Sequence, residues 1–380
     1  MSRIPVARPL LPSAEEIAPY LRRLDDTRMY SNFGPLATEL ERRLAERLGI
    51  DAQGLVSVAN ATVGLAATLS EIGRPGRNLC LLPSWTFCAS AHAVLQSGLQ
   101  PFFVDVDPLT WQLSPAALLA LPAEVLDRAA AAMIVGAFGA PVNPLAWDSF
   151  GARSGIPVVI DAAAGFDSVV ASTVPTVVSL HATKSLPAGE GGFVATADPE
   201  LGRAIRQRIN FGFAGSRTAE VAGMNGKLSE YTAAVGLASL DRWPASRGTW
   251  SRLRDGYDKR MRYARPVWFS GGTAQQAWVT ATFVLAVPAP VTTIAEELKA
   301  AGIDTRRWWQ AGCHREPAFE HCGRTDLAAT ECLAESALGL PFFPDLTEAH
   351  MDAVVAELVK HIGPDQQCEA GAVYPSGDRS

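Results

Sequence analysis

A lysine follows a predicted buried strand near the middle of the chain. Residues 176–180 form a short, mostly apolar run, and the chain then turns polar at His181, Thr183 and Lys184 before a stretch rich in glycine. Partial burial lowers the pKa of an ammonium group and makes the neutral amine available as a nucleophile or a Schiff-base partner. Because most lysines are exposed, the alternative is an ordinary surface lysine in a loop. Evidence from other residues is needed to favour a functional lysine.

A phosphate site is predicted near residue 60. Ala61 and Thr62 begin an apolar helix shortly after the strand predicted at residues 55–58. The free backbone N–H groups and the helix dipole at such an N-terminus can hold a phosphate. Asn60, just before them, also fits an ordinary N-cap, which needs no ligand.

An acid and an aromatic ring follow two further predicted strands. Asp161 closes the apolar run 157–160. A carboxylate there needs a partner such as a ligand cation or a ring nitrogen, although a turn-forming Asp is the alternative. Trp85 comes just after the strand predicted at residues 79–82, where it can cover a flat aromatic ligand or else pack into the core.

A phosphate site, an aromatic cover, an acid and an amine are together what pyridoxal phosphate requires. The lysine amine forms the Schiff base, and the acid keeps the pyridine nitrogen protonated so that the ring withdraws electrons. We therefore predict pyridoxal 5'-phosphate (PLP) as the cofactor, with Lys184 and Asp161 as the catalytic residues.

Composition excludes several classes of protein. Of 380 residues, 48% are hydrophobic and 19% are charged, with a net charge of −6, which is typical of a globular chain with room for two domains. No run of five basic residues occurs, so nucleic acid is not expected as a partner. The N-terminus lacks an apolar signal segment, and the longest uncharged run, 129–147, is broken by glycine and proline, so we expect no membrane partner. Six scattered cysteines without CxxC spacing favour a cytoplasmic protein with reduced thiols.

The pattern of apolar runs predicts the fold class. The runs do not alternate with polar residues and are separated by helical patterns, which predicts an α/β fold with a mainly parallel sheet flanked by helices. The predicted strands are residues 55–58, 79–82, 101–106, 131–135, 157–160 and 176–180. Ligands of such sheets lie beyond the carboxyl ends of the strands, where the candidate residues stand.

Two domains and a tail are expected. Residues 1–245 form an N-terminal arm and a large PLP-binding domain, and residues 246–363 form a smaller C-terminal α+β domain. The boundary is predicted at the WPASRG segment, residues 243–248. The polar residues 364–380 are expected to be a disordered tail.

The order of several short motifs resembles the DegT-type sugar-nucleotide aminotransferases, PLP-dependent enzymes with the aspartate aminotransferase fold (fold type I). The motifs are SNFGP at 31–35, PSWTF at 83–87, VDVD at 104–107, IDAA at 160–163, SLHATK at 179–184, GEGG at 189–192, GMN at 223–225 and LPFFP at 340–344. Each motif is weak alone, but their order is specific and spans most of the chain.

The resemblance implies roles for individual residues. Lys184 would form the Schiff base and carry the proton between substrate and cofactor carbons, Asp161 would pair with the pyridine nitrogen, and Trp85 would stack on the ring. The family's sites lie at the interface of a homodimer. The phosphate contacts would come from Ala61, Thr62 and Ser179, with Asn225 reaching the phosphate in the neighbouring subunit.

Three positions depart from the family pattern. Ala61 stands where the family usually has Gly, which keeps the backbone N–H. Lys227 replaces Arg, which keeps the charge but loses the bidentate fork. Ala164 replaces a Gln or His that touches the phenolic oxygen of the cofactor, so the tuning of the cofactor is left open.

We expect a PLP-dependent aminotransferase of amino-sugar biosynthesis. It would move an amino group from an amino acid, glutamate in most of the family, to a nucleotide-linked keto-deoxysugar. A cyclitol aminotransferase and a PLP-dependent sugar dehydratase are alternatives within the same fold. A regulatory protein that binds PLP without turnover is the alternative from another class.

Three further features are weighed more briefly. The cysteines and histidines at 313, 314, 321, 322 and 332 fit no zinc spacing, so we expect no metal. Residues 304–319, with two Arg and two Trp in a row, either bind a phosphorylated or carboxylate substrate or form a loop that closes over the core. His181 beside the lysine is expected to be a structural hydrogen-bonding residue.

Overall fold

The structure, a computed structural model, describes residues 3–261, 267–268, 278–287 and 290–362. The tail predicted at residues 364–380 lies outside the described residues. Within the described ranges, no helix has the length and apolar composition that crossing a membrane demands.

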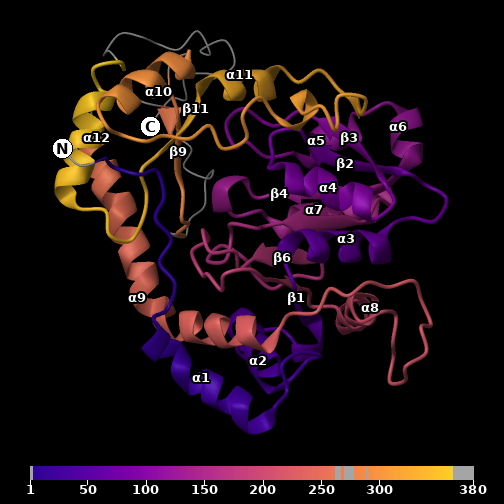
Figure 1. The fold of residues 1–380 in the computed structure, drawn as a ribbon. Coiled ribbons are helices and arrows are strands. Elements are labelled where there is room, and N and C mark those ends of the chain that lie inside the picture. The colour runs from indigo at the N-terminus through magenta and orange to yellow at the C-terminus, as the bar shows by residue number, and fades with distance from the viewer. Residues whose placement is uncertain (1–2, 262–266, 269–277, 288–289, 363–380) are drawn as a thin grey trace.

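An eight-stranded, mainly parallel sheet forms the centre of the large domain (Figure 1). Its strands lie in the order β1, β7, β6, β5, β4, β2, β3, β10, and among them β7 alone runs antiparallel to its neighbours. The strands are Leu55–Val58 (β1), Leu79–Pro83 (β2), Gln100–Val104 (β3), Ala129–Val135 (β4), Val158–Asp161 (β5), Thr176–Ser179 (β6), Gly192–Ala195 (β7) and Gly323–Arg324 (β10). The predicted α/β class with a mainly parallel sheet is confirmed.

Helices cover both faces of this sheet. The neighbouring residues Val177 and Val178 of β6 are both fully buried and belong to different hydrophobic clusters, as expected when both faces are covered. The helices of the large domain are Ala14–Thr27 (α1), Pro35–Leu48 (α2), Ala61–Ile72 (α3), Cys88–Gln96 (α4), Pro115–Leu119 (α5), Ala123–Arg128 (α6), Pro144–Ser154 (α7) and Pro199–Ile209 (α8). Ser13 caps α1 through a capping box, as its position in the sequence predicts.

The segment predicted as the domain boundary lies within a helix. Residues 243–248 lie inside the continuous helix α9, Glu230–Met261, which contains Pro244. Figure 1 shows α9 running under the large domain and then turning towards the small domain. A proline removes one backbone donor and can bend a helix without ending it. A boundary at residues 243–248 would therefore fall inside α9, not in a loop.

A smaller α+β unit follows, in agreement with the prediction of fold class. Its antiparallel sheet has the order β11, β9, β8. The elements are Val267–Trp268 (β8), Phe283–Ala286 (β9), Val291–Ala300 (α10), Ala328–Ser336 (α11), Ala337–Leu340 (β11) and Glu348–Leu358 (α12). The carboxylate of Asp105, just after β3, accepts hydrogen bonds from the backbone N–H groups of Ala329 and Thr330 at 2.7 and 2.9 Å. This contact ties the start of α11 to the carboxyl edge of the large sheet.

Two local features differ from what the sequence pattern predicts. Pro83 favours the first turn of a helix, but α4 begins only at Cys88, because residues 84–87 form a turn at the end of β2. The antiparallel strand β7 is not among the predicted strands, because Gly189, Gly191 and Gly192 in and before it indicate a loop when the sequence is read alone.

Candidate active site

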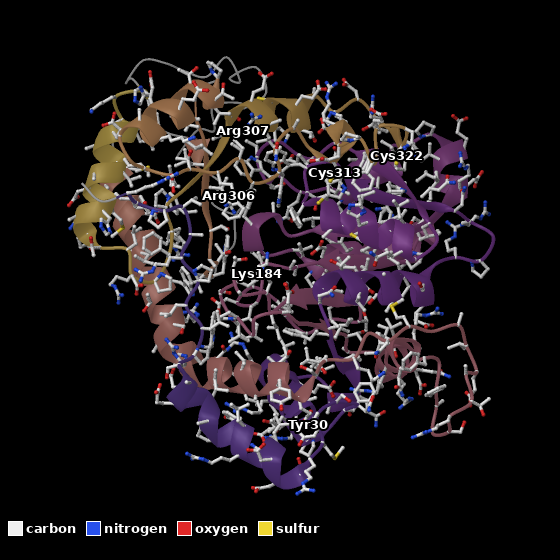
Figure 2. The ribbon with its side chains drawn as sticks, viewed as in Figure 1. Tyr30, Lys184, Arg306, Arg307, Cys313 and Cys322 are labelled. Atoms are coloured by element: carbon white, nitrogen blue, oxygen red, sulfur yellow. The ribbon has the colours of Figure 1, made fainter. Side chains whose placement is uncertain are left out.

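Lys184 lies in the loop between β6 and β7, at the carboxyl end of β6. This loop is closed by backbone hydrogen bonds from Ala182 N to Gly189 O (2.7 Å) and from Ala188 N to Leu180 O (2.7 Å). Figure 2 shows Lys184 in the region between the strands of the large domain and the small domain. The parallel strands thus present the lysine where ligands of such sheets bind.

The Lys184 amine has neither a hydrogen bond nor an ion pair to any residue that the structure describes. The residue is half-buried. Burial lowers the pKa of the Lys184 ammonium below its usual 10.5, and the nearby charge of Asp161 opposes this shift. A lysine in this state holds more neutral amine at a given pH than an exposed one, which is what a Schiff-base partner needs.

Asp161 is the last residue of β5 and is only 5% exposed. One carboxylate oxygen accepts from Ser90 Oγ at 2.7 Å, and the other accepts from the backbone N–H of Ala163 at 3.0 Å. Burial raises the pKa of this carboxyl, while the hydrogen bonds from Ser90 and Ala163 and the charge of Lys184 lower it. No cation of the described residues lies within ion-pair distance of Asp161. A protonated ring nitrogen therefore fits this carboxylate, whose oxygens keep room for one further donor.

The start of α3 offers a phosphate site. Asn60 is the N-cap, and its side chain accepts from the backbone N–H of Val63 at 3.0 Å. The first intrahelical bond runs from Gly64 N to Asn60 O, so the N–H groups of Ala61 and Thr62 precede it and have no partner within the helix. An N-cap and a phosphate site are thus compatible here, because Asn60 binds Val63 N and leaves the N–H groups of Ala61 and Thr62 for a phosphate.

The register of β7 brings Ser179 to the same place. Gly192, the first residue of β7, pairs with Val58 at the end of β1 on one side and with Ser179 at the end of β6 on the other. A Cβ on Gly192 would lie 3.0 Å from Ala61 N and 2.7 Å from the carbonyl oxygen of Val178. The Ser179 hydroxyl accepts from His181 N at 3.2 Å and keeps its own proton to donate. Gly192 therefore lies beside both Ser179 and the start of α3, where a side chain would meet backbone atoms.

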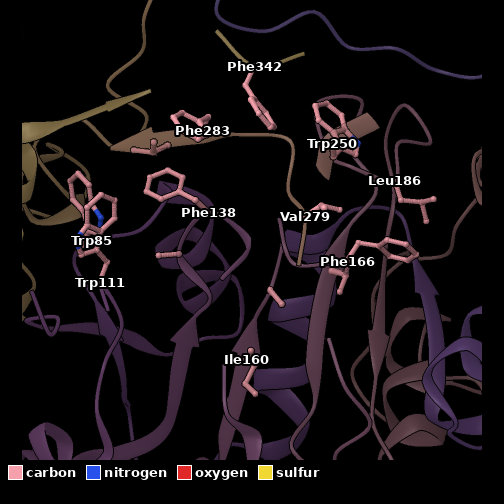
Figure 3. Packing of buried hydrophobic residues seen from close by; sticks show 14 of the residues in the cluster. Trp85, Trp111, Phe138, Ile160, Phe166, Leu186, Trp250, Val279, Phe283 and Phe342 are labelled. Atoms are coloured by element: carbon pink, nitrogen blue, oxygen red, sulfur yellow. The ribbon is translucent and has the colours of Figure 1, made fainter. Parts of the chain in front are cut away.

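Trp85 does not have the open face that stacking on a ligand ring requires. It is 2% exposed and packs edge-to-face against Trp111 (centroids 6.4 Å apart) and Trp309 (5.3 Å). Figure 3 shows Trp85 and Trp111 side by side within the hydrophobic cluster. The expectation that Trp85 stacks on the cofactor is thus at odds with the packing, which places it in the core.

A second aromatic residue in the same motif is exposed. Phe87 is the N-cap residue of α4 and is 58% exposed. Ser90, three residues later, is buried and donates to Asp161. The sequence carries both aromatics two positions apart, and nothing local tells which one faces a ligand. Contacts from Trp111 and Trp309, far along the chain, decide that Trp85 is the buried one.

Asn225 lies on the surface of the subunit. It is exposed, and its side-chain oxygen accepts from Lys227 Nζ at 2.7 Å. Lys227 also lies over the ring of Phe211 at 4.3 Å, and Phe211 is 45% exposed. The segment pairs through backbone bonds with the end of β1, where Ala59 N donates to Gly226 O at 2.8 Å. Asn225 is thus presented outward at the edge that carries the phosphate site.

Residues 304–319 mostly close over the core. Trp309 stacks on Phe138 with centroids 4.0 Å apart, and His314 is 3% exposed with its Nδ1 2.8 Å from Ser84 Oγ. Burial lowers the pKa of His314, and the charges of Arg315 and Arg324 act in the same direction. Arg306 remains exposed over the ring of Trp308. The packing favours the loop alternative for most of this segment.

His181 and Cys313 each have a structural contact. His181 Nδ1 accepts from Thr183 N at 3.2 Å and lies 2.8 Å from Thr183 Oγ1, so it orders the lysine turn. Cys313 is buried, with its thiol 3.4 Å from the carbonyl oxygen of Thr86. In the part of the chain that is described, no three His, Cys, Asp or Glu side chains group as a metal site would need.

A cavity opens beside the Lys184 loop. Its walls come from the N-terminal arm, the Lys184 loop, the second half of α9 and the segment after β11, including Arg8, Ser185, Thr249, Trp250 and Phe342. Figure 3 shows Trp250 and Phe342 above the strand that carries Ile160. The Lys184 loop therefore borders a cavity that is also lined by α9 and by the segment after β11.

Comparison with known proteins agrees with this geometry. Residues 12–359 match the DegT/DnrJ/EryC1/StrS aminotransferase family. Protein Rv3402c of Mycobacterium tuberculosis is 32% identical over 372 residues, which cover 93% of this chain and 89% of that protein. GDP-perosamine synthase of Caulobacter vibrioides is 27% identical over 373 residues, which cover 94% and 98%. A dTDP-4-amino-4,6-dideoxy-D-glucose transaminase of Shigella dysenteriae is 31% identical over 242 residues, 62% of this chain and 64% of that enzyme.

Solved structures share the fold over nearly the whole chain. A putative PLP-dependent aminotransferase from Bacillus cereus has a TM-score of 0.85 at 26% identity and covers 94% of this chain and 100% of that one. DesI, crystallised in the presence of its TDP-sugar product, has a TM-score of 0.83 at 28% identity and covers 98% and 95%. The predicted family and cofactor are confirmed: the chain belongs to the DegT/DnrJ/EryC1/StrS aminotransferase family and is a PLP-dependent aminotransferase.

Proposed function

We propose that this chain transfers an amino group from an amino acid, glutamate by expectation, to the keto carbon of a nucleotide-linked deoxysugar in the cytoplasm. The observation that carries the proposal is the pair at the ends of β5 and β6. Asp161 is a buried carboxylate with no cation of the described residues within ion-pair distance. It stands near Lys184, a half-buried amine that has no hydrogen bond or ion pair among those residues. The sugar-nucleotide part rests on the printed names of two relatives and of DesI with its TDP-sugar product.

PLP, when bound, supplies an electrophilic carbonyl and a ring that accepts electrons. Ala61 N, Thr62 N and the Ser179 hydroxyl would bind its phosphate, and Asp161 would hold a proton on its ring nitrogen. Phe87, rather than the buried Trp85, would lie against the ring from the start of α4. Lys184 Nζ would take a proton from, or return it to, the amine-bearing carbon of the donor and of the sugar.

We further propose a homodimer in which Asn225 of each subunit completes the phosphate site of the other. Asn225 points outward, and exposed aromatic residues lie on the same domain. Phe211 is 45% exposed, and Tyr30 and Tyr231 stack on each other at 46% and 54% exposure. A single subunit leaves these rings in water, and a second copy would bury them.

Spectroscopy on the purified, PLP-loaded protein tests the reaction. Glutamate should remove the visible absorbance of the cofactor, and a dTDP- or GDP-linked 4-keto-6-deoxysugar should restore it while an amino sugar appears by mass spectrometry. An unchanged spectrum with every amino acid would instead favour a PLP-binding regulatory protein. Conversion with loss of water rather than gain of an amine would favour a dehydratase, and turnover of a free keto-cyclitol would favour a cyclitol aminotransferase.

Mixing two inactive variants tests the shared site. Lys184→Ala lacks the amine, and Asn225→Ala lacks the partner's phosphate contact. In a mixed dimer, one site combines an intact Lys184 with an intact Asn225, so activity should return on mixing and refolding. Activity of the mixture equal to the average of the separate variants would show that each subunit works alone.

A further inference from the structure

Behind Asp161 lies a short chain of buried hydroxyl groups. Asp161 Oδ2 lies 2.7 Å from Ser90 Oγ, and Ser90 Oγ lies 2.8 Å from Thr86 Oγ1. The three residues are 5%, 1% and 2% exposed. Thr86 and Ser90 are four residues apart, across the turn that opens α4. Both hydroxyls are buried and lead to Asp161 through hydrogen bonds, so we expect their contribution to act through Asp161.

The direction of the hydrogen bonds is fixed when Asp161 is ionised. A carboxylate only accepts, so Ser90 donates its single hydroxyl proton to Asp161. Ser90 can then only accept at its other contact, so Thr86 is the donor there. All protons in the chain therefore point towards the carboxylate.

A protonated Asp161 does not fit this arrangement. A proton on Oδ2 would reverse the direction of these hydrogen bonds: Asp161 would donate to Ser90, and Ser90 would donate to Thr86. The hydroxyl proton of Thr86 would then need another acceptor, and no other hydrogen bond to this hydroxyl exists among the described residues. A proton on Oδ1 would instead face the N–H of Ala163, which already donates to that oxygen at 3.0 Å. Both oxygens of Asp161 are thus committed as acceptors.

The far end of the chain is held by the small domain. The Cys313 thiol donates to the carbonyl oxygen of Thr86 at 3.4 Å, and Cys313 N donates to the carbonyl oxygen of Ser84 at 2.9 Å. The Ser84 hydroxyl accepts from His314 N at 3.1 Å. These bonds hold the backbone of the turn that carries Thr86 in place.

We propose that Thr86 and Ser90 are positioning residues that keep Asp161 ionised and fixed towards the ring nitrogen of PLP. Burial alone raises the pKa of Asp161, and the hydrogen bond from Ser90 is the largest influence that opposes it. The chain thus offsets the cost of placing a carboxylate in the core before any cofactor arrives. The inference rests on the proposed pairing of Asp161 with the ring nitrogen.

The protonation state of the ring nitrogen is the direct readout. PLP labelled with 15N in the ring is bound to the wild type and to variants, and its NMR shift reports how far that nitrogen is protonated. Ser90→Ala should move the shift towards the unprotonated position and weaken PLP binding about tenfold. Thr86→Val, which keeps the shape and loses the hydroxyl, should have a smaller effect of about threefold, and Ser90→Thr should restore both signals.

Two controls separate the possible failures. Ser336→Ala removes another buried hydroxyl, bonded to Cys332 O at 2.9 Å in α11, and should leave the 15N shift unchanged. Asp161→Asn should move the shift at least as far as Ser90→Ala. If Ser90→Ala does not fold, Thr86→Val and Ser90→Thr carry the test.

The outcomes are distinct. If Ser90→Ala and Thr86→Val leave the 15N shift and the PLP affinity unchanged while Asp161→Asn changes the shift, the proposed role of Ser90 and Thr86 is wrong. The pairing of Asp161 with the ring nitrogen is then unaffected. An unchanged shift in Asp161→Asn would overturn the pairing itself. Loss of thermal stability without a change in shift would assign the hydroxyls a structural role only.

Discussion

Gly192 of β7 lies against Ala61 at the start of α3, so closely that a Cβ on the glycine would be 3.0 Å from the Ala61 nitrogen. This contact sets the position of the N–H groups that we assign to the phosphate. The same glycine pairs with Ser179, so it lies beside two of the three residues that we propose as phosphate ligands.

Gly192→Ala should therefore weaken cofactor binding. The added methyl group meets backbone atoms of Val178 and Ala61, which cannot rotate away as a side chain could. We expect a loss of roughly 1–3 kcal/mol in stability, together with a lower affinity for PLP measured by fluorescence titration well below the melting temperature. Gly248→Ala is the matched control, since its Cβ would meet nothing within 4 Å in α9. It should raise stability by about 0.5–1 kcal/mol. Equal PLP affinity in the two variants would argue against the proposed phosphate site.

Phe87→Ala and Trp85→Phe should separate the two aromatic residues of the motif. Phe87 is 58% exposed, so its loss should leave the melting temperature nearly unchanged and weaken PLP binding about tenfold if it covers the ring. Trp85 is packed between Trp111 and Trp309, so its truncation should cost stability of roughly 1–3 kcal/mol by leaving a cavity. PLP titration and thermal unfolding of both variants provide the measurement. The reverse pattern, with Trp85 controlling affinity, would restore the expectation drawn from the sequence.

Glu230→Ala should destabilise the junction of α2 and α9. Its two carboxylate oxygens accept from the backbone N–H groups of Leu36 and Ala37 at 2.7 and 2.8 Å, and the residue is 1% exposed. Removing it leaves two buried donors unsatisfied, at a cost of about 3 kcal/mol. Urea unfolding measures this, with the exposed Glu190→Ala as the control, expected within about 0.5 kcal/mol of the wild type. Similar unfolding midpoints for the two variants would show that Glu230 does not stabilise the start of α2.

The stability of the apoprotein should depend on the Lys184 amine through pH. Its pKa in the folded state lies below 10.5 because of burial, so the unfolded state holds the proton to higher pH. The free energy of unfolding contributed by this group therefore rises with pH between the folded pKa and 10.5, and is constant above that window. The free energy of unfolding of Lys184→Met should exceed that of the wild type by the largest amount at the lower end of this pH range. The difference should shrink towards pH 10.5. Urea unfolding of both apoproteins across that range tests this, and parallel profiles would contradict it.

Much of this fold follows from local sequence patterns. The strands that end at Val58, Asp161 and Ser179 are apolar runs, and the α3 start after Asn60 is an ordinary N-cap signal. Because the strands are parallel, placing their ends also places Lys184 and Asp161 at one edge. These candidate residues together predict PLP, the family resemblance agrees with that prediction, and the comparisons confirm the cofactor.

What the sequence leaves open depends on contacts between distant residues. Pro244 indicates a helix end locally, yet α9 continues because both of its halves pack against other helices. The glycines before β7 indicate a loop, and only pairing with β1 and β6 makes that segment a strand. Trp85 is buried because it packs against Trp111 and Trp309, which are distant in the sequence. Phe87 is then the aromatic residue of the motif that stays exposed. The hydroxyls of Thr86 and Ser90 carry the i, i+4 spacing of a helix start, but nothing local points to Asp161.

The central claim is that Lys184 is the covalent partner of the cofactor. The protein is loaded with PLP, reduced with sodium borohydride, digested and mapped by mass spectrometry, with Lys184→Ala treated in parallel. The account predicts a reduced pyridoxyl adduct on the peptide that contains Lys184, and none in the variant. An adduct confined to another lysine, or no adduct at all in a fully loaded protein, would contradict it.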